Sequence, residues 1–378
     1  MALPVGSSAD SWRARAAAFA EREVRPVAEA IDRDDRLPPA LVKRLAEERF
    51  LGLGIPPEWD GVGGDARSLT AVLEELSAVS AAVAVVVAVH LSVCSHPILR
   101  WGTDGQKDRY LRPLARGEGV GAFGLTEPGV GSDTARLATR YSREGDGFVL
   151  RGTKMFISNA ATAGVVLVFA TRDPTLGNRG ISAFIVPPGT SGFSVAQRLD
   201  KLGLRGNETV ELVMDGVRLP ADGLLGAEGE GLTVALGSLT SGRVGIAACA
   251  LGVARSAFEE LRRQVREDDA EWKRTLLARA YVDLSAARAL VREAAELKDA
   301  GRSFVAEASA AKLAASRAAV SIASSAVDVA GPRGVRSGTP AERLLRDARV
   351  FPIVEGTTEI QELILGRSLL SDAPPRNP

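Results

Sequence analysis

Residues 122–133 read Ala-Phe-Gly-Leu-Thr-Glu-Pro-Gly-Val-Gly-Ser-Asp and lie where the character of the sequence changes. Upstream, residues 10–116 are rich in Ala, Leu, Glu and Arg and are punctuated by prolines, which predicts a series of helices. Downstream, to about residue 225, short runs of β-branched and aromatic residues alternate with clusters of Gly, Asp, Asn and Pro, which predicts strands. The stretch therefore opens a β region that follows a helical one.

The predicted strands are short, and no segment long enough for a helix separates them. They are expected at Phe148–Leu150, Val165–Phe169, Ile181–Val186, Phe193–Val195 and Thr209–Met214. This spacing argues against a parallel sheet built from βαβ units. It favours a small antiparallel barrel or sandwich, and we expect a central β-barrel.

Helical periodicity returns after about residue 229. Apolar residues recur every three or four positions from Val244 to Val265, and further helices are expected over 277–297, over 304–322, after Pro340 and around 360–370. Short links between long helices are typical of a bundle. The chain is thus expected to be mainly α with a central β-barrel: an N-terminal helical domain (1–119), a middle β-barrel domain (120–226) and a C-terminal four-helix bundle (227–378).

Composition excludes several classes of protein. The 378 residues include 47 Lys and Arg and 47 Asp and Glu, so charge gives no reason to expect nucleic acid or a membrane as partner. Two cysteines, Cys94 and Cys249, exclude a disulfide framework, and His90 and His96 are too few and too local for a typical metal site. We interpret the histidines and Cys249 as structural. No signal peptide is recognisable, so a cytoplasmic protein is expected.

Residues 78–93 form an almost wholly apolar run built on Ala and Val. A membrane-spanning helix needs about 20 such residues. This run is shorter and carries Ser80, His90 and Ser92, with Pro97 shortly after it. The pattern predicts a helix buried inside a soluble domain.

A glycine pattern at Gly119, Gly121 and Gly124 matches the spacing of a dinucleotide-binding turn. That turn must open a helix, and Pro128 with the glycines after it prevents one. We therefore reject a Rossmann site. What the pattern predicts instead is a loop rich in backbone N–H groups, with Thr126 and Ser132, that can cradle a phosphate or a polar ring edge.

Five ordered segments of the chain share a family signature. They are AFGLTEPGVGSD (122–133), GTKMFISN (152–159), KLGLRGNET (201–209), GRVGIAA (242–248), and RDA (346–348) with IVEGTTEIQ (353–361). Together they resemble the acyl-CoA dehydrogenase family, in particular its short-chain, butyryl-CoA-like branch, over residues 10–371. The order helices, strands and helix bundle agrees with the fold of that family.

The resemblance implies a flavoprotein of fatty acid metabolism that oxidises an acyl-CoA with FAD. It implies FAD contacts at Phe123, Leu125, Thr126, Ser132, Phe156, Ile157, Ser158, Thr357 and Glu359. Leu125 and Thr126 would contact the isoalloxazine ring, Phe156 would pack on its face opposite the substrate, and Ser158 would bond near N5. The implied substrate contacts are Ser132, Arg243 and Gly356, with Arg243 holding the CoA part.

The resemblance also implies that Glu355 is the catalytic base. The α-hydrogen of a thioester is a weak acid, and in the family its carbonyl is polarised by a backbone N–H at the base and a ribityl hydroxyl of FAD. Glu355 would take the α-proton while the β-hydrogen leaves as hydride to flavin N5, and its apolar neighbours should raise its pKa. Some branches place the base at the position of Gly242, which leaves Glu355 as the candidate here. The alternative is an acid at a helix N-terminus, capped by Thr357 or Thr358.

Several departures from the family fall among the residues that, in the family, contact the FAD bound by a neighbouring subunit. The family has Arg followed by Phe-Gly after the 242–261 helix, but residues 262–272 read RRQVREDDAEW. Asp328 stands where an amide is usual, and Pro332, which has no N–H, replaces a glycine. Thr240 replaces an acidic residue near the CoA contacts. We therefore expect the part of the FAD site built by this chain's own middle domain and Glu355 to be intact. The part that this chain contributes to the FAD of a neighbouring subunit is expected to be weakened.

Two assemblies are consistent with these departures. A homo-oligomer, dimer or tetramer, would bind FAD less tightly or through Arg262, Arg263 or Arg266; alternatively, a paralogous subunit would supply the missing residues. The expected electron acceptor is an electron-transfer flavoprotein. The alternatives are an acyl-CoA oxidase that uses oxygen, an enzyme acting on acyl carrier protein, and a non-catalytic subunit of the same fold. A nitroalkane oxidase relative is less favoured, because that branch uses Asp as base.

Overall fold

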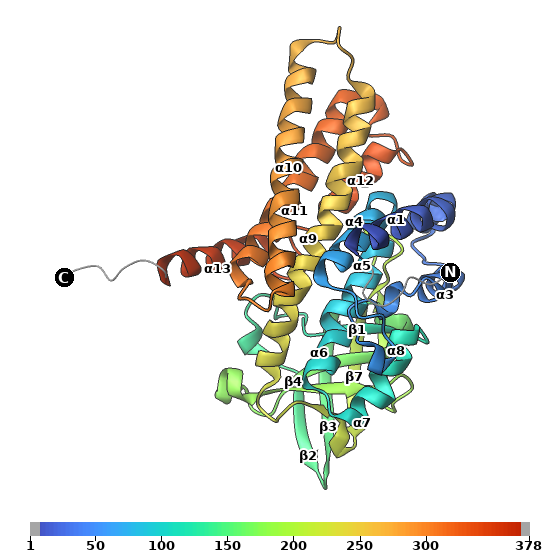
Figure 1. Ribbon diagram of the computed structural model, residues 1–378. Coiled ribbons are helices and arrows are strands. Elements are labelled where there is room, and N and C mark those ends of the chain that lie inside the picture. The colour runs from blue at the N-terminus through green and yellow to red at the C-terminus, as the bar shows by residue number, and fades with distance from the viewer. Residues whose placement is uncertain (1–7, 372–378) are drawn as a thin grey trace, which may run out of the picture.

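The computed structural model describes residues 8–371 and begins with a helical domain (Figure 1). Its helices are α1 (Ala9–Phe19), α2 (Ala28–Asp34), α3 (Pro39–Glu47), α4 (Ala66–Val79), α5 (Ala81–Val89), α6 (His96–Trp101), α7 (Asp104–Gln106) and α8 (Arg112–Arg116). Asp65 caps the N-terminus of α4, because its carboxylate accepts the Ser68 N–H at 2.7 Å. The prediction of a helical N-terminal region is confirmed.

The apolar run lies inside this domain. Helix α5 and the π-helical turn η5 (His90–Ser95) are buried along their whole length. Three stretches of helix, Ala81–Trp101, Gly231–Gln264 and Val305–Arg333, are long and apolar enough by length and composition to cross a membrane, and 89% of the apolar window in the first is buried within the protein. Packing in the core therefore accounts for this composition, as predicted.

The middle region forms one eight-stranded sheet. Its strands are β1 (Val120–Gly124), β2 (Arg140–Glu144), β3 (Gly147–Ser158), β4 (Ala163–Thr171), β5 (Ile181–Val186), β6 (Phe193–Arg198), β7 (Thr209–Leu219) and β8 (Leu224–Leu225). Pairing runs β6-β7-β3-β2-β4-β5-β8, with β1 beside β4. The path does not close, because the largely exposed β6 pairs only with β7 and the two-residue β8 only with β5. The expected β-barrel is therefore not formed.

Strand β1 is a second correction to the expected fold. Residues 122–124 were predicted to begin a loop, but they belong to β1, which runs parallel to β4 with Phe123 opposite Leu167. The glycines at 121 and 124 hide the strand from a pattern search, because they lack the side chains that mark β-structure. The loop itself starts at Leu125.

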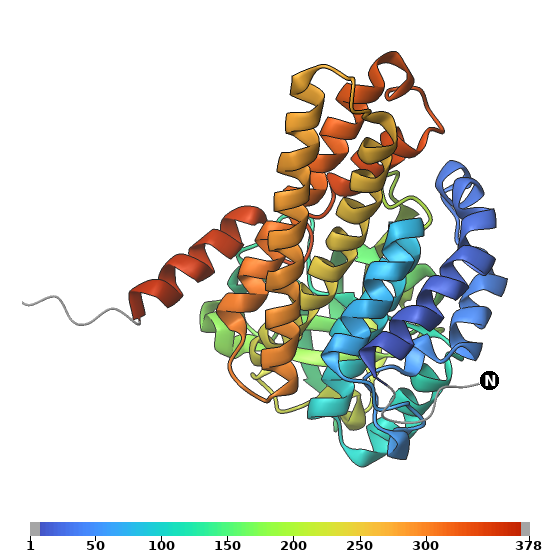
Figure 2. The same cartoon turned by 45° about the horizontal axis from the view of Figure 1, so that its top comes forward.

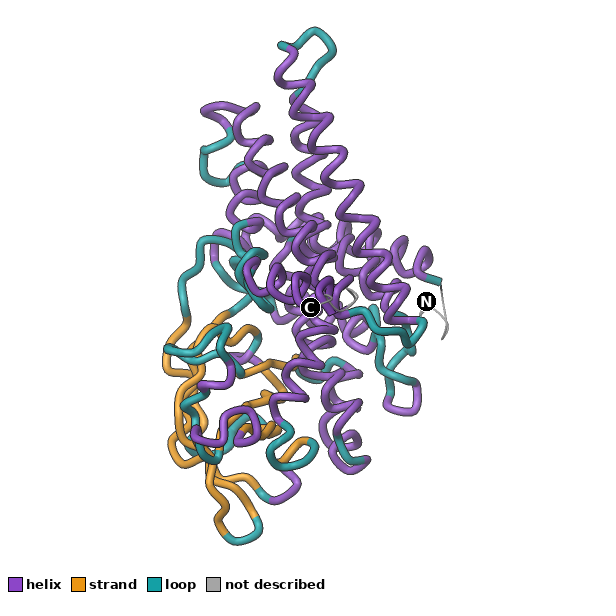
Figure 3. Tube along the Cα trace, turned by 90° about the vertical axis from the view of Figure 1, so that its left-hand side faces the viewer, coloured by secondary structure: helices purple, strands orange, loops and turns teal. Residues whose placement is uncertain are grey.

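The C-terminal region is built on three long helices, α9 (Gly231–Gln264), α10 (Glu271–Asp299) and α11 (Val305–Ala330), with the shorter α12 (Pro340–Ala348). They pack together, and α9 and α10 also pack against α4 of the N-terminal region, with the sheet at the other end of the molecule (Figures 2 and 3). Helix α13 (Thr358–Ser371) projects away from the bundle (Figure 1). The expected helices are all present, and the turn between α12 and α13 carries Glu355.

Candidate active site

The turn before α13 holds Glu355 in an unusual backbone conformation. Glu355 has φ of 51° and Gly356 has φ of 96°, so two consecutive residues lie in the left-handed region. The turn is closed by Thr358, whose N–H donates to the Pro352 carbonyl oxygen at 2.8 Å. A non-glycine residue in this region costs on the order of 1 kcal/mol and persists only where its surroundings hold it, commonly at functional sites.

The Glu355 carboxylate faces α9. The residue as a whole is half-buried, but both carboxylate oxygens are buried and have no hydrogen-bond partner among residues 8–371. A Cβ placed on Gly242 would lie 2.1 Å from Glu355 Oε2 and 3.0 Å from Val93 Cγ1. The carboxylate therefore occupies the space that a side chain at 242 would need, and a buried acid without a partner requires a reason.

The alternative role of Glu355 as a helix-terminal acid is contradicted by this geometry. Thr357 caps α13, because its hydroxyl oxygen accepts the Ile360 N–H at 3.4 Å. The acid in the first turn of α13 is the exposed Glu359, whose pKa is lowered by hydrogen bonds from its own amide and from Thr357. Glu355 makes no such contact.

Two buried cations lie near the Glu355 carboxylate. Burial raises the pKa of Glu355 to about 7, and the charges of Arg243 on α9 and Lys312 on α11 limit the rise. Burial lowers the pKa of Arg243, and its Nε has no hydrogen-bond partner among the described residues. Lys312 was not predicted from the sequence. It is fully buried, and its Nζ donates to the Gly356 carbonyl oxygen at 2.7 Å.

A second group of predicted residues lies on the sheet, where an internal ion pair fastens the loop after β1. Lys154 Nζ lies 2.8 Å from Glu127 Oε1 and donates to the Leu125 carbonyl oxygen at 3.1 Å. Glu127 also accepts the N–H groups of Ala138 and Thr139 at 2.7 and 2.9 Å. The Glu127 carboxylate thus connects the start of the loop to its end at Ala138 and Thr139, and to Lys154 on β3.

Both charges of this pair persist at neutral pH. Burial lowers the pKa of Lys154 to about 8, in spite of the attraction of Glu127. Burial pushes the pKa of Glu127 upward, but the Lys154 charge and its hydrogen bonds bring it below the usual value. The carboxylate is therefore ionised, and the ammonium stays protonated below about pH 8.

Phe156 is presented to solvent at a bulge in β3. The register with β7 shifts between Lys154 and Ile157, and Phe156 at that shift has φ of 61° and a 65% exposed side chain. The Met155 N–H beside it donates to the Thr126 carbonyl oxygen at 2.9 Å, which sets the loop against this strand. A large aromatic face held open by a bulge is a platform on which a flat ring can stack.

The remaining predicted residues differ in how far they are available to a ligand. Thr126 and Ser158 are half-buried and Ser132 is exposed. Leu125 and Ile157 are buried in the core, so a ligand can reach them only through their backbone. Phe123 is half-buried and its ring lies 4.9 Å from that of Phe169.

Asn159, the last residue of one family segment, joins the N-terminal region to the sheet. Its amide donates to the carbonyl oxygens of Val86 and Gly121, each at 3.1 Å, and its φ is 67°.

The prediction of a structural role for His90 is confirmed, because its Nε2 lies 2.9 Å from the Leu51 carbonyl oxygen and its Nδ1 accepts the Gly121 N–H at 3.0 Å. Burial lowers the pKa of His90 to about 4, so it is neutral.

Two further family segments meet at α12. Asp347 accepts the Leu204 N–H at 2.7 Å, and Arg346 donates to the Leu202 carbonyl oxygen at 3.2 Å. Arg346 also forms a two-point ion pair with Asp32 at the end of α2. The segment 201–209 is thereby fixed to the helix that leads to Glu355.

The residues that depart from the family lie at the ends of the long helices. Arg262 and Arg263 are exposed in the last turn of α9 and pair with Glu259 and Glu260. Asp328 is exposed in the last turn of α11. Both helix ends lie at the end of the bundle away from the sheet (Figure 1).

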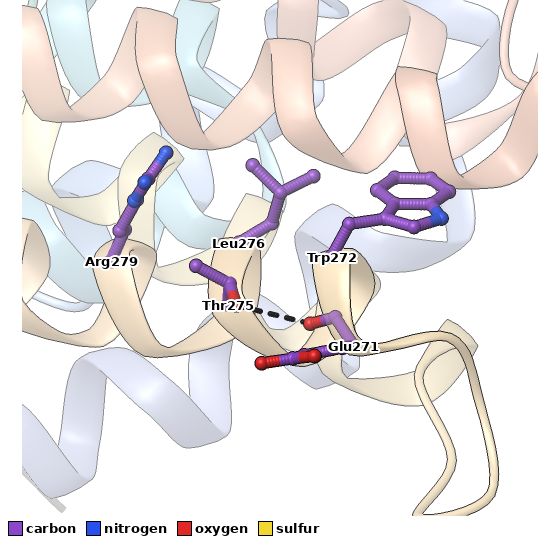
Figure 4. Close-up of a pocket in the computed structure, with 5 residues that line it drawn as sticks. All are labelled: Glu271, Trp272, Thr275, Leu276 and Arg279. Carbon is purple, nitrogen blue, oxygen red and sulfur yellow. Dashed lines mark hydrogen bonds between the residues drawn. The ribbon is translucent and has the colours of Figure 1, made fainter.

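A shallow surface pocket of about 410 Å³ lies near the start of α10. It is lined by Glu271, Trp272, Thr275, Leu276 and Arg279 (Figure 4). Its one internal hydrogen bond, from the Thr275 hydroxyl to the Glu271 carbonyl oxygen, is a contact within the helix. The pocket contains none of the predicted site residues, and Glu355 is not part of it.

Replacing Gly242 by Ala is expected to lower turnover by about 10- to 100-fold, because the new Cβ displaces the Glu355 carboxylate and an error of about 1 Å in a reacting group has effects of this size. The melting temperature should fall only modestly, because the preference of a helix for Ala offsets part of the crowding of the new Cβ against Glu355 and Val93. Steady-state kinetics and thermal unfolding measure the two quantities.

The matched control is Gly245→Ala, one turn further along α9. There the nearest atom to the new Cβ is Ser92 Oγ at 3.2 Å, and Glu355 is not among its neighbours. Turnover should stay within about twofold of the unmodified protein, as expected for a helical Gly→Ala change away from the reacting groups. Equal losses in both variants would show that crowding of α9, and not displacement of Glu355, is responsible.

Most of the chain matches one family in comparisons with known proteins. Sequence profiles for the N-terminal, middle and C-terminal domains of acyl-CoA dehydrogenases match residues 7–118, 122–217 and 229–370. A protein of Clostridium acetobutylicum named "Acyl-CoA dehydrogenase, short-chain specific" is 40% identical over 355 residues, which are 92% of this chain and 94% of the relative.

Solved structures agree with the sequence comparison. Butyryl-CoA dehydrogenase from Megasphaera elsdenii superposes with a TM-score of 0.94 at 34% identity, over 98% of this chain and all of the other. A glutaryl-CoA dehydrogenase from Mycobacterium smegmatis, solved in complex with FADH2, gives a TM-score of 0.89 at 31% identity, over 97% and 96% of the two chains. The arrangement of helical, sheet and helical domains is therefore a known one.

Proposed function

Because the chain belongs to the acyl-CoA dehydrogenase family, we propose that it oxidises a short-chain acyl-CoA to the trans-2-enoyl thioester with Glu355 as the base. The observation that carries the proposal is the buried Glu355 carboxylate, which faces α9 and has no hydrogen-bond partner among the described residues. The short-chain and butyryl-CoA names of its relatives support a short acyl group. Those names do not favour the oxidase alternative.

FAD is the proposed cofactor, and the exposed residues of the sheet fit a flat, polar-edged ring. Phe156 offers an exposed aromatic face, and the loop after β1 offers the half-buried Thr126, whose carbonyl oxygen binds the N–H of the adjacent Met155, and the exposed Ser132 further along the loop. The neighbour solved with FADH2 supports this choice. The residues proposed to hold FAD are Phe123, Leu125, Thr126, Ser132, Phe156, Ile157, Ser158, Thr357 and Glu359, with Leu125 and Ile157 acting through their backbone. When bound, FAD supplies the acceptor for the β-hydrogen and its electron pair.

The chain's own residues supply the proton chemistry. Glu355 takes the α-proton, and the apolar enclosure that raises its pKa makes it a stronger base toward a weak carbon acid. The Glu355 amide forms no hydrogen bond within the described residues, so it is available to polarise the thioester carbonyl. Arg243, Ser132 and Gly356 are proposed to bind the substrate, with Arg243 directed to the CoA part.

The proposed electron acceptor is an electron-transfer flavoprotein, and the proposed assembly is a homo-oligomer, dimer or tetramer. A paralogous subunit is the alternative, because Asp328 and Pro332 replace residues that the family lends to a neighbouring FAD. Purification from the native host distinguishes the two. A single chain species with one FAD per chain excludes the paralogous subunit, and a second chain in constant ratio excludes the homo-oligomer.

The function is tested by adding acyl-CoA thioesters of increasing length to the purified protein under anaerobic conditions. Bleaching of the flavin absorbance by butyryl-CoA, with formation of the enoyl thioester, is the expected result. A flavin-free protein, or a flavin that no acyl-CoA bleaches, would refute the proposal. Consumption of oxygen with substrate alone would favour the oxidase instead.

The rate should depend on pH through Glu355. A base acts only when it is unprotonated, so kcat/KM should rise as pH increases through the pKa of about 7 and level off above it. A profile measured between pH 5 and 9 with one acyl-CoA checks this. Well below the pKa, the unprotonated fraction should rise about tenfold for each pH unit. A profile that is flat below pH 6 would contradict the raised pKa.

A further inference from the structure

The Gly356 carbonyl oxygen is held by donors from two different helices. Lys312 Nζ on α11 donates to it at 2.7 Å, and Gln361 Nε2 on α13 donates at 2.9 Å. This carbonyl belongs to the residue directly after Glu355, where the chain passes through two left-handed residues. Holding the carbonyl therefore helps to hold the turn from which the Glu355 side chain leaves the backbone.

Lys312 is an unusual residue for its position. It is fully buried on the face of α11 that also carries Ala308, Ala311 and Ala315, all of them buried. Burial lowers its pKa to about 8, and no carboxylate lies within ion-pair distance of its Nζ among residues 8–371. Burying a cation in this way is costly, and within the described part of the chain its one hydrogen bond goes to the carbonyl oxygen of Gly356, next to Glu355.

The charged and titratable groups around Glu355 come from each element packed against it. Arg243 and Cys249 face it from α9, Lys312 faces it from α11, and Glu359 at the start of α13 acts on Lys312. Arg243 and Lys312 both favour the ionised carboxylate, so Lys312 combines a charge effect with a hydrogen bond. Gln361 contributes a hydrogen bond to the same oxygen without a charge.

We propose that Lys312 is a positioning residue for the reaction, which holds the carbonyl of Gly356 beside Glu355 and, as a neighbouring cation, favours the ionised form of the Glu355 carboxylate. The inference rests on the proposed role of Glu355 as base and deepens it. Without the lysine, the left-handed turn loses the stronger of its two donors and the carboxylate loses one of its two neighbouring cations. Both changes act on the base and neither requires contact between Lys312 and the substrate.

Three variants separate the charge from the hydrogen bond. Lys312→Met removes both, Lys312→Gln keeps a donor but removes the charge, and Gln361→Met removes one uncharged donor to the same oxygen. In the two Lys312 variants the midpoint of kcat/KM against pH should rise by about one unit, as expected when an opposite charge is removed from near a carboxylate. In Gln361→Met the midpoint should not move, although kcat falls.

The loss of kcat should depend on whether the residue at position 312 still donates a hydrogen bond to the Gly356 carbonyl oxygen. We expect kcat at high pH to fall by about 10- to 100-fold in Lys312→Met and by less in Lys312→Gln, since misplacement of a reacting group costs rate steeply. A direct readout is the carboxyl titration of Glu355 by ¹³C NMR of glutamate-labelled protein, assigned by comparison with Glu355→Gln. The Glu355 pKa should rise in both Lys312 variants.

An unchanged pH midpoint and an unchanged Glu355 titration in Lys312→Gln would overturn the inference, even if the melting temperature falls. If Lys312→Met does not fold, Lys312→Gln alone decides the question. Failure of the proposed function is a different result, because it would appear as full activity in Glu355→Gln with Lys312 intact.

Discussion

Glu355→Gln is expected to lose turnover by about 10²- to 10⁴-fold, the range that a general base contributes, while the protein keeps its fold and its flavin. Gln has the same shape but cannot take a proton from the substrate. Since neither oxygen of Glu355 has a hydrogen-bond partner among the described residues, no internal bond is broken by the change. The melting temperature should change little, because two effects oppose each other: a buried carboxylate without a hydrogen-bond partner is removed, but the buried cations Arg243 and Lys312 lose the negative charge beside them. Stopped-flow bleaching of the flavin and thermal unfolding measure both effects.

The control for this variant is Glu362→Gln on α13. Glu362 is about half exposed, pairs with Arg317 at the surface, and is not among the residues proposed to contact substrate or flavin. Its turnover should match that of the unmodified protein. Near-normal turnover in Glu355→Gln would mean that another group removes the proton, and the assignment of the base would then be wrong.

Periodicity predicted the helices well and the sheet only in part. Spacing of three and four residues located α9 to α12, because each of these helices buries an apolar face against a neighbour. Helix α13 was located as well, although its Leu363, Leu369 and Leu370 are exposed. Strand β1 was missed since Gly121 and Gly124 give it no β-pattern. Closure of the sheet could not be judged from the sequence either, because it depends on whether the edge strands β6 and β8 meet, and their pairing involves residues far apart in the chain.

The candidate site, like the fold, was predicted only in part. A family signature indicated Glu355, but the sequence did not reveal its left-handed backbone or Lys312, which binds the carbonyl of Gly356 from 44 residues earlier in the chain. A contact of that separation is decided by how α11 packs beside the turn. A signal for Lys312 was nevertheless present, since a lone lysine among Ala308, Ala311 and Ala315 on one helix face must be satisfied internally if that face is buried.

The ion pair between Lys154 and Glu127 should give the largest stability effect in the sheet. Lys154→Met is expected to lower the free energy of unfolding by about 3–5 kcal/mol, the usual cost of breaking a buried pair and leaving one charge behind. Both side chains are almost completely buried, and Glu127 also holds the N–H groups of Ala138 and Thr139. The loop that carries Thr126 and Ser132 should loosen, so flavin content on purification should fall as well. Denaturant unfolding and flavin absorbance per chain measure these losses.

Two controls identify the cause of the loss. Glu127→Gln in the Lys154→Met background removes the stranded charge, so the double variant should be more stable than Lys154→Met alone. Arg151→Met, on the same strand, breaks the exposed pair with Asp215 and should leave stability and flavin content unchanged, because exposed pairs contribute little. If the double variant is no more stable than the single one, the loss comes from altered packing at position 154. The ion pair would then not be what fixes the loop, and the flavin platform at Phe156 would depend on the bulge alone.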